Sequence, residues 1–349
     1  MVFYISVYLI CLILSVVADK KDSKPLKFLI CVIFVIITGF RGSQVGIDTE
    51  NYINIWDNLY YGRATFVEPG FTLMNLALQK FTDNPVAIFV TSSSIIYFLI
   101  INRLWDFKRI ASFPVMISVL YMSHLMMSMN VLRQYCAVAI IFYFTRYLSK
   151  GDYIRFIIGI LIASTLHLSS LIGFLMFAFE ILKWKNLNRA QKLLLGIGIA
   201  MSPFILYVAS RFAFNQFGGY FSNSESNIGF LTSGKMLFIC YACFSFNLFK
   251  KKKDFRIDNL SLDVFIRNTI LTVILGLCLV SIGYFFPFME RIGLLFSLYE
   301  ILFWGILFKL ISNQNKVLCF LVFSFLVIYP FISSIINNGQ GTVPYSFCL

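Results

Sequence analysis

Six ionisable side chains stand at or beside the ends of long apolar runs: Arg41, Asp48, Glu68, Arg133, His167 and Arg291. Guanidinium groups bind phosphate oxygens through paired hydrogen bonds. Carboxylates and histidine can accept or release a proton when they lie within hydrogen-bond reach of a reacting group. Together these side-chain types suit group transfer from a substrate that carries a phosphate or diphosphate.

The arginines lie where anions are readily bound. Asn130 is a plausible N-cap, which puts Arg133 in the first turn of a helix. Arg291 follows Pro287 at the start of a later apolar run. Helix N-termini attract anions through free N–H groups and the macrodipole. With Arg41 as a third cation at the same depth, the pattern predicts a diphosphate site. The alternative is that each arginine reaches separately to a lipid phosphate.

Three residues are candidates for the proton acceptor. His167 lies at a tight turn between two apolar segments, and histidine ordinarily titrates near neutral pH. Asp48 and Glu68 flank a long polar segment. A histidine at the membrane edge is costly and usually functional, although it could also close the turn with a structural hydrogen bond. Tyr52 could stack on a sugar ring, but an interfacial aromatic belt is the commoner cause of such residues.

Composition decides what surrounds these residues. Of 349 residues, 59% are hydrophobic and 13% charged, with a mean hydropathy of +0.82. Soluble domains are about 45–50% apolar and about 25% charged, so the solvent of this chain must be lipid. The net charge of +13 is divided among short patches between apolar runs, which argues against nucleic acid as a partner. Cys240 and Cys243 lack a second cysteine pair, and acidic clusters are missing from the sequence, so we expect no metal or other cofactor.

Apolar runs of this length cross a bilayer as helices. The sequence predicts an all-α polytopic membrane protein, a single transmembrane domain over 1–349. Its twelve spans are expected at 2–18, 26–40, 85–102, 110–127, 130–147, 153–167, 169–184, 193–211, 234–249, 264–286, 289–309 and 317–336. The run 153–184 is divided near His167 to Ser170 because it is too long for one helix. The segment 70–81 is too short to span, so it is expected to be an interfacial or re-entrant helix.

Basic residues then orient the chain. Alternating loops place 22 of the 29 Lys and Arg residues on one side and 7 on the other. Because Lys and Arg concentrate in cytoplasmic loops, both termini are predicted to lie outside. The two long outer loops are 41–69 and 212–233. Arg41, Arg133 and Arg291 thus lie on the side that ordinarily avoids positive charge, and the site is expected on the outer face of the membrane.

The same residues form motifs of a known family. Arg41 to Tyr52 reads RGSQVGIDTENY, similar to R-x(3)-VGxDTxxY; Glu68 to Phe71 is similar to E-x-G-F/Y; Arg133-Gln134, Lys150 and His167-Leu-Ser169 are similar to RQ…K…H-x-S. Arg291 after Glu290 resembles a late arginine. In order and spacing these resemble the EpsG family of Wzy-type bacterial polysaccharide polymerases, most strongly over 38–175. The region 185–285 carries no matching motif.

The resemblance implies a reaction on polyprenyl-diphosphate glycans. A glycan on undecaprenyl diphosphate would be transferred to the non-reducing sugar of another lipid-linked repeat unit, as in capsule, exopolysaccharide or O-antigen synthesis. His167, Asp48 or Glu68 would act as base, and Arg41, Arg133 and Arg291 would bind the diphosphate without a metal. Thr49, Tyr52, Gln134, Ser169 and Glu290 would support sugar binding. Membrane lipid, a flippase and a chain-length regulator of the same pathway are the implied partners.

Two other functions fit much of the same pattern. A flippase or transporter of lipid-linked oligosaccharide would share the spans and the arginines, but such proteins tend to show internal repeats and charges lining the membrane interior. Neither feature stands out in the sequence. An outer-face glycan ligase would use nearly the same chemistry, and only the order of the motifs argues against it.

Overall fold

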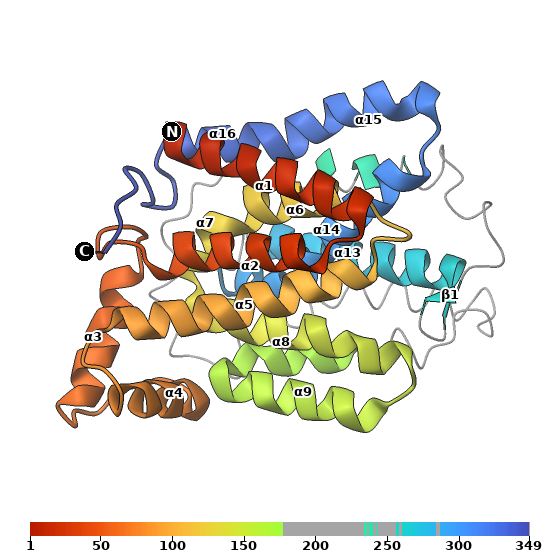
Figure 1. The fold of residues 1–349 in the computed structure, drawn as a ribbon. Helices are drawn as coiled ribbons and strands as arrows, with labels where there is room; N and C mark the ends of the chain where they lie inside the picture. The colour runs from red at the N-terminus through yellow and green to blue at the C-terminus, as the bar shows by residue number, and fades with distance from the viewer. Residues whose placement is uncertain are drawn as a thin grey trace. The chain divides into compact units, whose positions relative to one another are not determined.

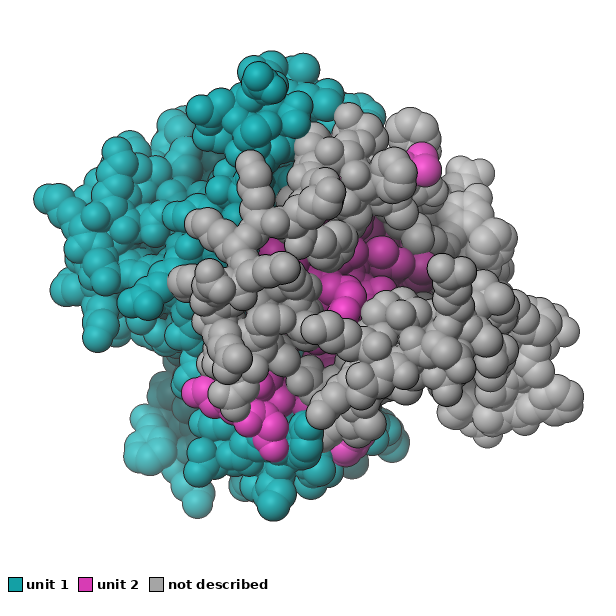
Figure 2. All heavy atoms as spheres, turned by 90° about the vertical axis from the view of Figure 1, so that its right-hand side faces the viewer, with its two compact units in different colours: residues 1–147, 152–171, 304–349 teal, residues 148–151, 172–303 magenta. Residues whose placement is uncertain are grey.

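The computed structural model describes residues 1–176, 234–235, 237–239, 242, 256–257, 260–283 and 287–348. The chain divides into two compact units, coloured separately in Figure 2. Unit 1 holds residues 1–147, 152–171 and 304–349, and unit 2 holds residues 148–151 and 172–303. Apart from two paired two-residue strands, β1 (Arg256–Ile257) and β2 (Leu260–Ser261), and one isolated bridge, the regular elements described are helices.

Unit 1 is built around three long helices that run side by side, α1 (Val2–Lys21), α2 (Lys24–Gly39) and α5 (Val86–Asp106) (Figure 1). Helix α2 packs against α5 along its length, and α1 packs against α2. The Ser23 side chain caps α2 by accepting from the Leu26 N–H at 3.4 Å, and Pro25 occupies the first turn, where its missing N–H costs nothing. These are the predicted first three spans.

The next predicted span is interrupted. It consists of α6 (Phe113–Val119), a π-helical turn η1 (Leu120–His124) and α7 (Leu125–Asn130), and α8 (Leu132–Ser149) follows after Val131. The N-cap role predicted for Asn130 is wrong, because Asn130 ends α7. Its side chain instead donates to the Gln340 carbonyl at 2.9 Å and accepts from the Asp48 N–H at 3.5 Å.

One short helix lies within the long loop that was expected, and the short helix predicted near 70–81 follows it. Helix α3 (Thr49–Tyr60) falls within the predicted outer loop 41–69, and α4 (Pro69–Gln79) follows. Helix α4 packs on α3, α5 and α9 (Tyr153–Leu166). Its 11 residues extend about 16 Å, roughly half the thickness of a bilayer core, so the prediction of a short helix near 70–81 is confirmed. Its interfacial or re-entrant position stays a prediction.

After α9 the chain turns at His167 into the 3-10 helix η2 (Leu168–Phe174), as expected for a break near His167 to Ser170. In unit 2, α13 (Leu262–Gly283) packs closely on the first part of α14 (Pro287–Leu310). A Cβ built on Gly276 would lie 2.9 Å from the Phe296 Cβ, so the glycine allows this approach. Unit 1 ends in η5 (Asn313–Asn315), α15 (Lys316–Phe323), the π-helical η6 (Ser324–Ile328) and α16 (Tyr329–Ile336).

Four of the described helices are long and apolar enough to cross a membrane, Val2–Lys21, Val86–Asp106, Arg291–Leu310 and Asn313–Ile336. Shorter apolar helices include Tyr153–Leu166. The predicted spans 193–211 and most of 234–249, part of 169–184, and the loop 212–233 lie outside the described residues. The total of twelve spans and the outward position of the termini stay predictions.

One end of unit 1 carries a cluster of basic residues, and the charge pattern predicts that this end is cytoplasmic. Contacts between helix ends at the predicted cytoplasmic side join Lys108 to Asp22, Lys27 to Asn102 (2.6 Å) and Arg146 to Asp106 (2.7 Å). Arg41 and His167 follow the far ends of α2 and α9. Arg133 lies at the start of α8, whose other end carries Arg146. The candidate site residues of this unit therefore gather at the end opposite the basic cluster.

Candidate functional site

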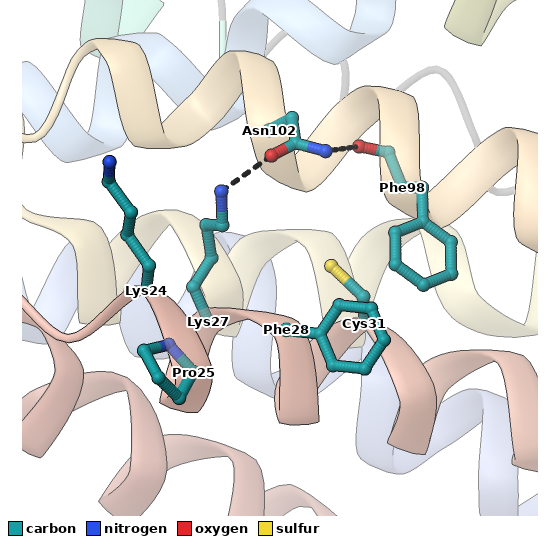
Figure 3. Close-up of a pocket in the computed structure, with 7 residues that line it drawn as sticks. All are labelled: Lys24, Pro25, Lys27, Phe28, Cys31, Phe98 and Asn102. Atoms are coloured by element: carbon teal, nitrogen blue, oxygen red, sulfur yellow. Dashed lines mark hydrogen bonds between the residues drawn. The ribbon is translucent and has the colours of Figure 1, made fainter.

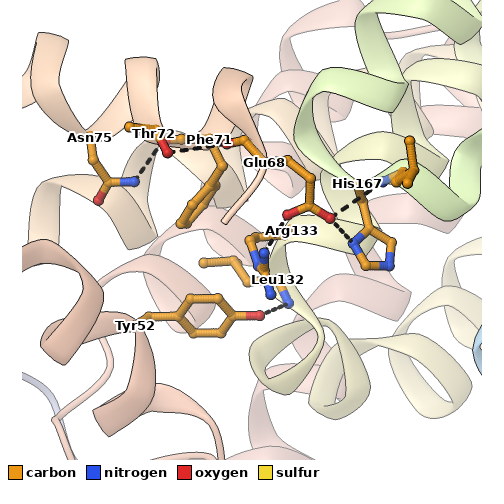
Figure 4. Close-up of polar contacts among 9 residues, drawn as sticks. Tyr52, Glu68, Phe71, Thr72, Asn75, Leu132, Arg133 and His167 are labelled. Carbon is orange, nitrogen blue, oxygen red and sulfur yellow. Dashed lines mark hydrogen bonds and ion pairs between the residues drawn. The ribbon is translucent and has the colours of Figure 1, made fainter. Parts of the chain in front are cut away.

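Glu68 is the centre of a three-residue cluster at that end (Figure 4). Its Oε1 lies 2.8 Å from Nδ1 of His167, and its Oε2 forms an ion pair with Nη1 of Arg133. The Leu168 N–H also donates to Oε1 at 3.3 Å. The side chains of Glu68, His167 and Arg133 retain 19%, 21% and 23% of their exposure, so a substrate can reach a site that is otherwise shielded.

The Glu68-Pro-Gly-Phe71 motif explains how the carboxylate is held. Glu68 precedes α4 in extended backbone, and Pro69 begins the helix. A Cβ on Gly70 would lie 2.8 Å from the Thr165 carbonyl oxygen and 2.7 Å from the Thr165 Cβ, so only glycine lets α4 approach α9 this closely. Phe71 is fully buried and anchors the first turn. The motif therefore docks α4 on α9 and brings Glu68 to His167.

His167 is positioned by the end of α9. Its N–H closes the last turn on Ala163 O at 3.0 Å, while its own backbone is extended, with φ −157° and ψ 117°. The ring thereby leaves the helix and meets Glu68. With the carboxylate as acceptor, the hydrogen bond assigns the proton to Nδ1 and leaves the Nε2 lone pair available. This arrangement can take a proton from a bound hydroxyl group.

Arg133 is the second residue of α8, so the prediction that it lies in a helical first turn is confirmed. The preceding Leu132 N–H donates to the Tyr52 hydroxyl at 3.0 Å, which ties the start of α8 to α3. The Arg133 guanidinium lies 5.8 Å from the centre of the Phe71 ring. Tyr52 is buried and packs on Phe71, so in this structure it positions α8 and has no open face for a sugar.

Charge decides the role of Glu68. Partial burial alone would raise the pKa of its carboxyl group, but the hydrogen bond to His167 and the charge of Arg133 outweigh it and lower the pKa from 4.5 to about 2. Glu68 is thus ionised throughout the physiological range and is a weak base. Its position suits holding His167 in one tautomer and stabilising a positive charge that forms on the ring.

Arg41 occupies a different environment. The residue is 1% exposed, and its guanidinium donates to Thr49 Oγ1 at 3.1 Å, to Met129 O at 2.8 Å and to Thr38 O. It also lies 4.3 Å from the centre of the Phe89 ring. Burial lowers its pKa to about 10, so it stays charged at neutral pH. These contacts give Arg41 a packing role in joining α2, α3 and α7, and they leave little of the group for a diphosphate.

The rest of the Arg41-to-Tyr52 segment folds as a compact turn. Gly46 has φ +98°, and a Cβ there would lie 2.8 Å from Asn130 Oδ1, so this position requires glycine. Thr49 is buried and its hydroxyl donates to Val45 O at 2.6 Å. Asp48 is half-buried at the start of α3. A cavity of about 350 Å³ beside this turn is bounded in part by Arg41 itself, together with Ser43, Gln44, Ile53, Phe89 and Phe347.

The other predicted residues are more scattered. Gln134 is buried on α8, and Ser169 is half-buried in η2, two residues after His167. Arg291 is exposed on α14 in unit 2, so it is not placed relative to Arg133. The side chain of Glu290 lies outside the described residues. Convergence of the three arginines is therefore not seen within unit 1.

The C-terminal segment was missed by sequence reasoning. Gly42 N–H donates to Ser346 O at 2.8 Å, Cys348 N–H to Phe40 O at 2.9 Å, and Gly46 N–H to Gly341 O at 2.8 Å. The segment therefore covers the Arg41 turn. The polar run Asn337-Asn-Gly-Gln-Gly341 after the last apolar run is the signal that could have indicated it. Among the described residues, no group of three His, Cys, Asp or Glu side chains could hold a metal ion.

Its long apolar helices make the chain a membrane protein, and an Arg–Glu–His cluster lies at one end of unit 1. The family comparison agrees: the model of the EpsG family matches residues 24–347. The chain belongs to the EpsG family, a Wzy-like polysaccharide polymerase family. No curated protein and no solved structure matches the chain.

Proposed function

We propose that this protein polymerises oligosaccharide repeat units carried on undecaprenyl diphosphate at the outer leaflet of a bacterial cell membrane. The observation that carries the proposal is the Glu68 carboxylate, shared between a histidine ring 2.8 Å away and an arginine, at the helix end away from the basic cluster. Membership of the EpsG family supports the same reaction class.

In the proposed reaction, a hydroxyl oxygen on the non-reducing sugar of one repeat unit attacks the anomeric carbon of the glycan on a second lipid. The bond from that carbon to the diphosphate oxygen breaks, and the lipid diphosphate leaves with the electron pair. Nε2 of His167 takes the hydroxyl proton, and Glu68 stabilises the imidazolium that forms. Asp48 is the alternative base, since its half-buried carboxylate lies at the start of α3, beside the Arg41 turn.

Arg133 is the candidate ligand for the leaving diphosphate. Only Nη1 is used by Glu68, and the side chain is 23% exposed, so its other N–H groups can reach a phosphate. When His167 gains a proton, Glu68 is drawn to the new positive charge and neutralises less of the charge on Arg133. The guanidinium would then bind most strongly as negative charge develops on the leaving group, which is the requirement for catalysis. We infer no such role for the buried Arg41.

The test uses the purified full chain in lipid nanodiscs with a polyprenyl-diphosphate repeat unit. Wild type is expected to convert the unit into a ladder of multimers, and His167→Gln and Arg133→Ala are expected to form none. Glu50→Gln and Arg63→Ala, exposed residues of the same outer segment, are matched controls that should keep the ladder. A ladder from both site variants would refute the proposed site.

The same preparation separates the rival functions. Movement of the unit across a vesicle membrane without multimers would favour a flippase. Transfer to a different acceptor, with no multimers in its absence, would favour a ligase. Proposed partners are the lipid-linked glycans, with a flippase and a chain-length regulator acting before and beside the polymerase.

A further inference from the structure

A second cavity, of about 330 Å³, lies between α2 and α5 at the basic end of unit 1 (Figure 3). Its walls include Lys24, Lys27, Phe28, Cys31, Phe98 and Asn102, and we call it the α2–α5 groove. It is formed at the helix ends that lie away from Glu68 and His167. The proposed glycosyl transfer makes no use of it.

The cations of the groove lack acidic partners. Nζ of Lys27 donates to Oδ1 of Asn102 at 2.6 Å, and Nδ2 of Asn102 in turn donates to Phe98 O at 2.7 Å, so a neutral amide fixes the ammonium group. Lys24 is exposed and is the first residue of α2, three positions before Lys27. In the part of the chain that the structure describes, neither lysine forms an ion pair with a carboxylate. Both lie in the first turn of α2, where the helix dipole disfavours cations. A bound anion would offset this unfavourable interaction for each lysine.

The part of the groove beside Phe28 and Phe98 is apolar. Phe28 is 56% exposed, and its ring centre lies 5.4 Å from that of Phe98 on α5. Cys31 is buried behind these rings. Two ammonium groups beside the exposed Phe28 ring and the half-buried Phe98 ring match a molecule with an anionic head and an apolar tail. A free phosphate ion would contact only the part that holds Lys24 and Lys27.

We propose that the α2–α5 groove binds one anionic phospholipid, with its phosphate on Lys24 and Lys27 and an acyl chain along Phe28 and Phe98. Lysine binds phosphate as a point charge, which tolerates a mobile headgroup. The charge pattern places this end in the cytoplasmic leaflet, where anionic lipids hold basic residues near the surface. The site is independent of the proposed polymerase reaction, so either proposal can fail without the other.

Native mass spectrometry of the full chain, titrated with phosphatidylglycerol or phosphatidylcholine, measures this binding directly. The test variant is Lys24→Gln/Lys27→Gln, because glutamine at 27 can still donate to Asn102. We expect it to bind phosphatidylglycerol roughly thirtyfold more weakly than wild type, from about 1 kcal/mol for each lysine. Lys20→Gln/Lys21→Gln is the matched control, since it removes the same charge from exposed positions at the end of α1 and should leave the affinity unchanged.

Each outcome decides the proposal. Unchanged phosphatidylglycerol binding in the groove variant would overturn it, and so would an equal loss in the α1 control, which would indicate a general surface charge effect. Equal stabilisation of the wild type by inorganic phosphate, read as the thermal unfolding midpoint, would replace the lipid with a free anion. An unchanged midpoint of the groove variant in phosphatidylcholine would show that it folds. If it does not fold, Lys24→Gln alone, an exposed change, should still weaken phosphatidylglycerol binding about fivefold, and no weakening would overturn the site.

Discussion

Nδ1 of His167 lies 2.8 Å from Oε1 of Glu68, while the other oxygen of the same carboxylate is ion-paired with Arg133. One ionised group thus holds both a proton acceptor and a cation. Because α4 and α9 supply Glu68 and His167 and α8 supplies Arg133, the cluster exists only when three helices are docked. Changes in any of these side chains should therefore affect chemistry and packing to different extents.

Glu68→Gln should remove most activity with little loss of protein. The amide keeps the size of the side chain but no longer stabilises a positive charge on His167, and it weakens the orientation of the ring. We expect multimer formation to slow roughly 100-fold or more, the range of general acid–base effects. Initial rates of ladder formation measure this. Glu50→Gln, an exposed carboxylate in the first turn of α3, should leave the rate within about twofold.

Arg133→Lys should separate charge from geometry. Lysine keeps one positive charge but cannot donate to Glu68 and a phosphate through a planar fork. We expect the thermal unfolding midpoint of Arg133→Lys to lie closer to wild type than that of Arg133→Ala. We expect both variants to lose activity to the same extent, roughly 100-fold. Full activity of Arg133→Lys would show that only charge is needed. Arg63→Ala serves as the control because Arg63 is exposed after α3.

The pH dependence of stability should report the Glu68 interactions. Its pKa is about 2 in the folded state and 4.5 as the ordinary value, so its contribution is present above pH 4.5 and is lost as the pH falls towards 2. The difference in unfolding midpoint between wild type and Glu68→Gln should shrink over that range. A difference that stays constant with pH would contradict the low pKa. Glu50→Gln should show no such trend.

The sequence identified the residues of the cluster but not their pairing. Glu68 and His167 are 99 positions apart, and their contact depends on the close approach of Gly70 to Thr165, which no local pattern encodes. Helix starts were more predictable, because Ser23 and Pro25 impose them locally. The short helix near 70–81 followed from its length. Helix α3 was missed because it is too polar to resemble a span, although Tyr52, Ile55 and Trp56 recur at helical spacing.

The surroundings of Arg41 also could not be predicted from the sequence. An arginine after an apolar run indicated a phosphate ligand, but its partners are backbone carbonyls and a threonine brought together by folding. Its burial depends in part on the C-terminal segment, whose Phe347 forms a bridge with Arg41. Residue type and depth in the membrane cannot distinguish an arginine that binds a substrate from one that binds the protein's own backbone.

Arg41→Ala should therefore act on folding more than on chemistry. It removes hydrogen bonds to Met129 O, Thr38 O and Thr49 Oγ1, and each buried acceptor left unpaired costs about 1–3 kcal/mol. We expect a lowered unfolding midpoint and less protein in the membrane, with the protein that remains active per molecule. Gln44→Ala, exposed in the same turn, is the control. A stable but inactive Arg41→Ala would restore the diphosphate role.

Gly70→Ala tests whether helix docking positions the site. The added Cβ would lie 2.8 Å from the Thr165 carbonyl oxygen, which is backbone and cannot rotate away, so α4 must shift from α9 and carry Glu68 away from His167. We expect activity to fall at least about tenfold, because misplacing a catalytic group by an ångström is costly. Gly339→Ala is the control, since its nearest neighbour in the described structure is the Ser334 hydroxyl oxygen at 3.9 Å. Retention of full activity by Gly70→Ala would mean that the Glu68–His167 contact is not needed for the reaction.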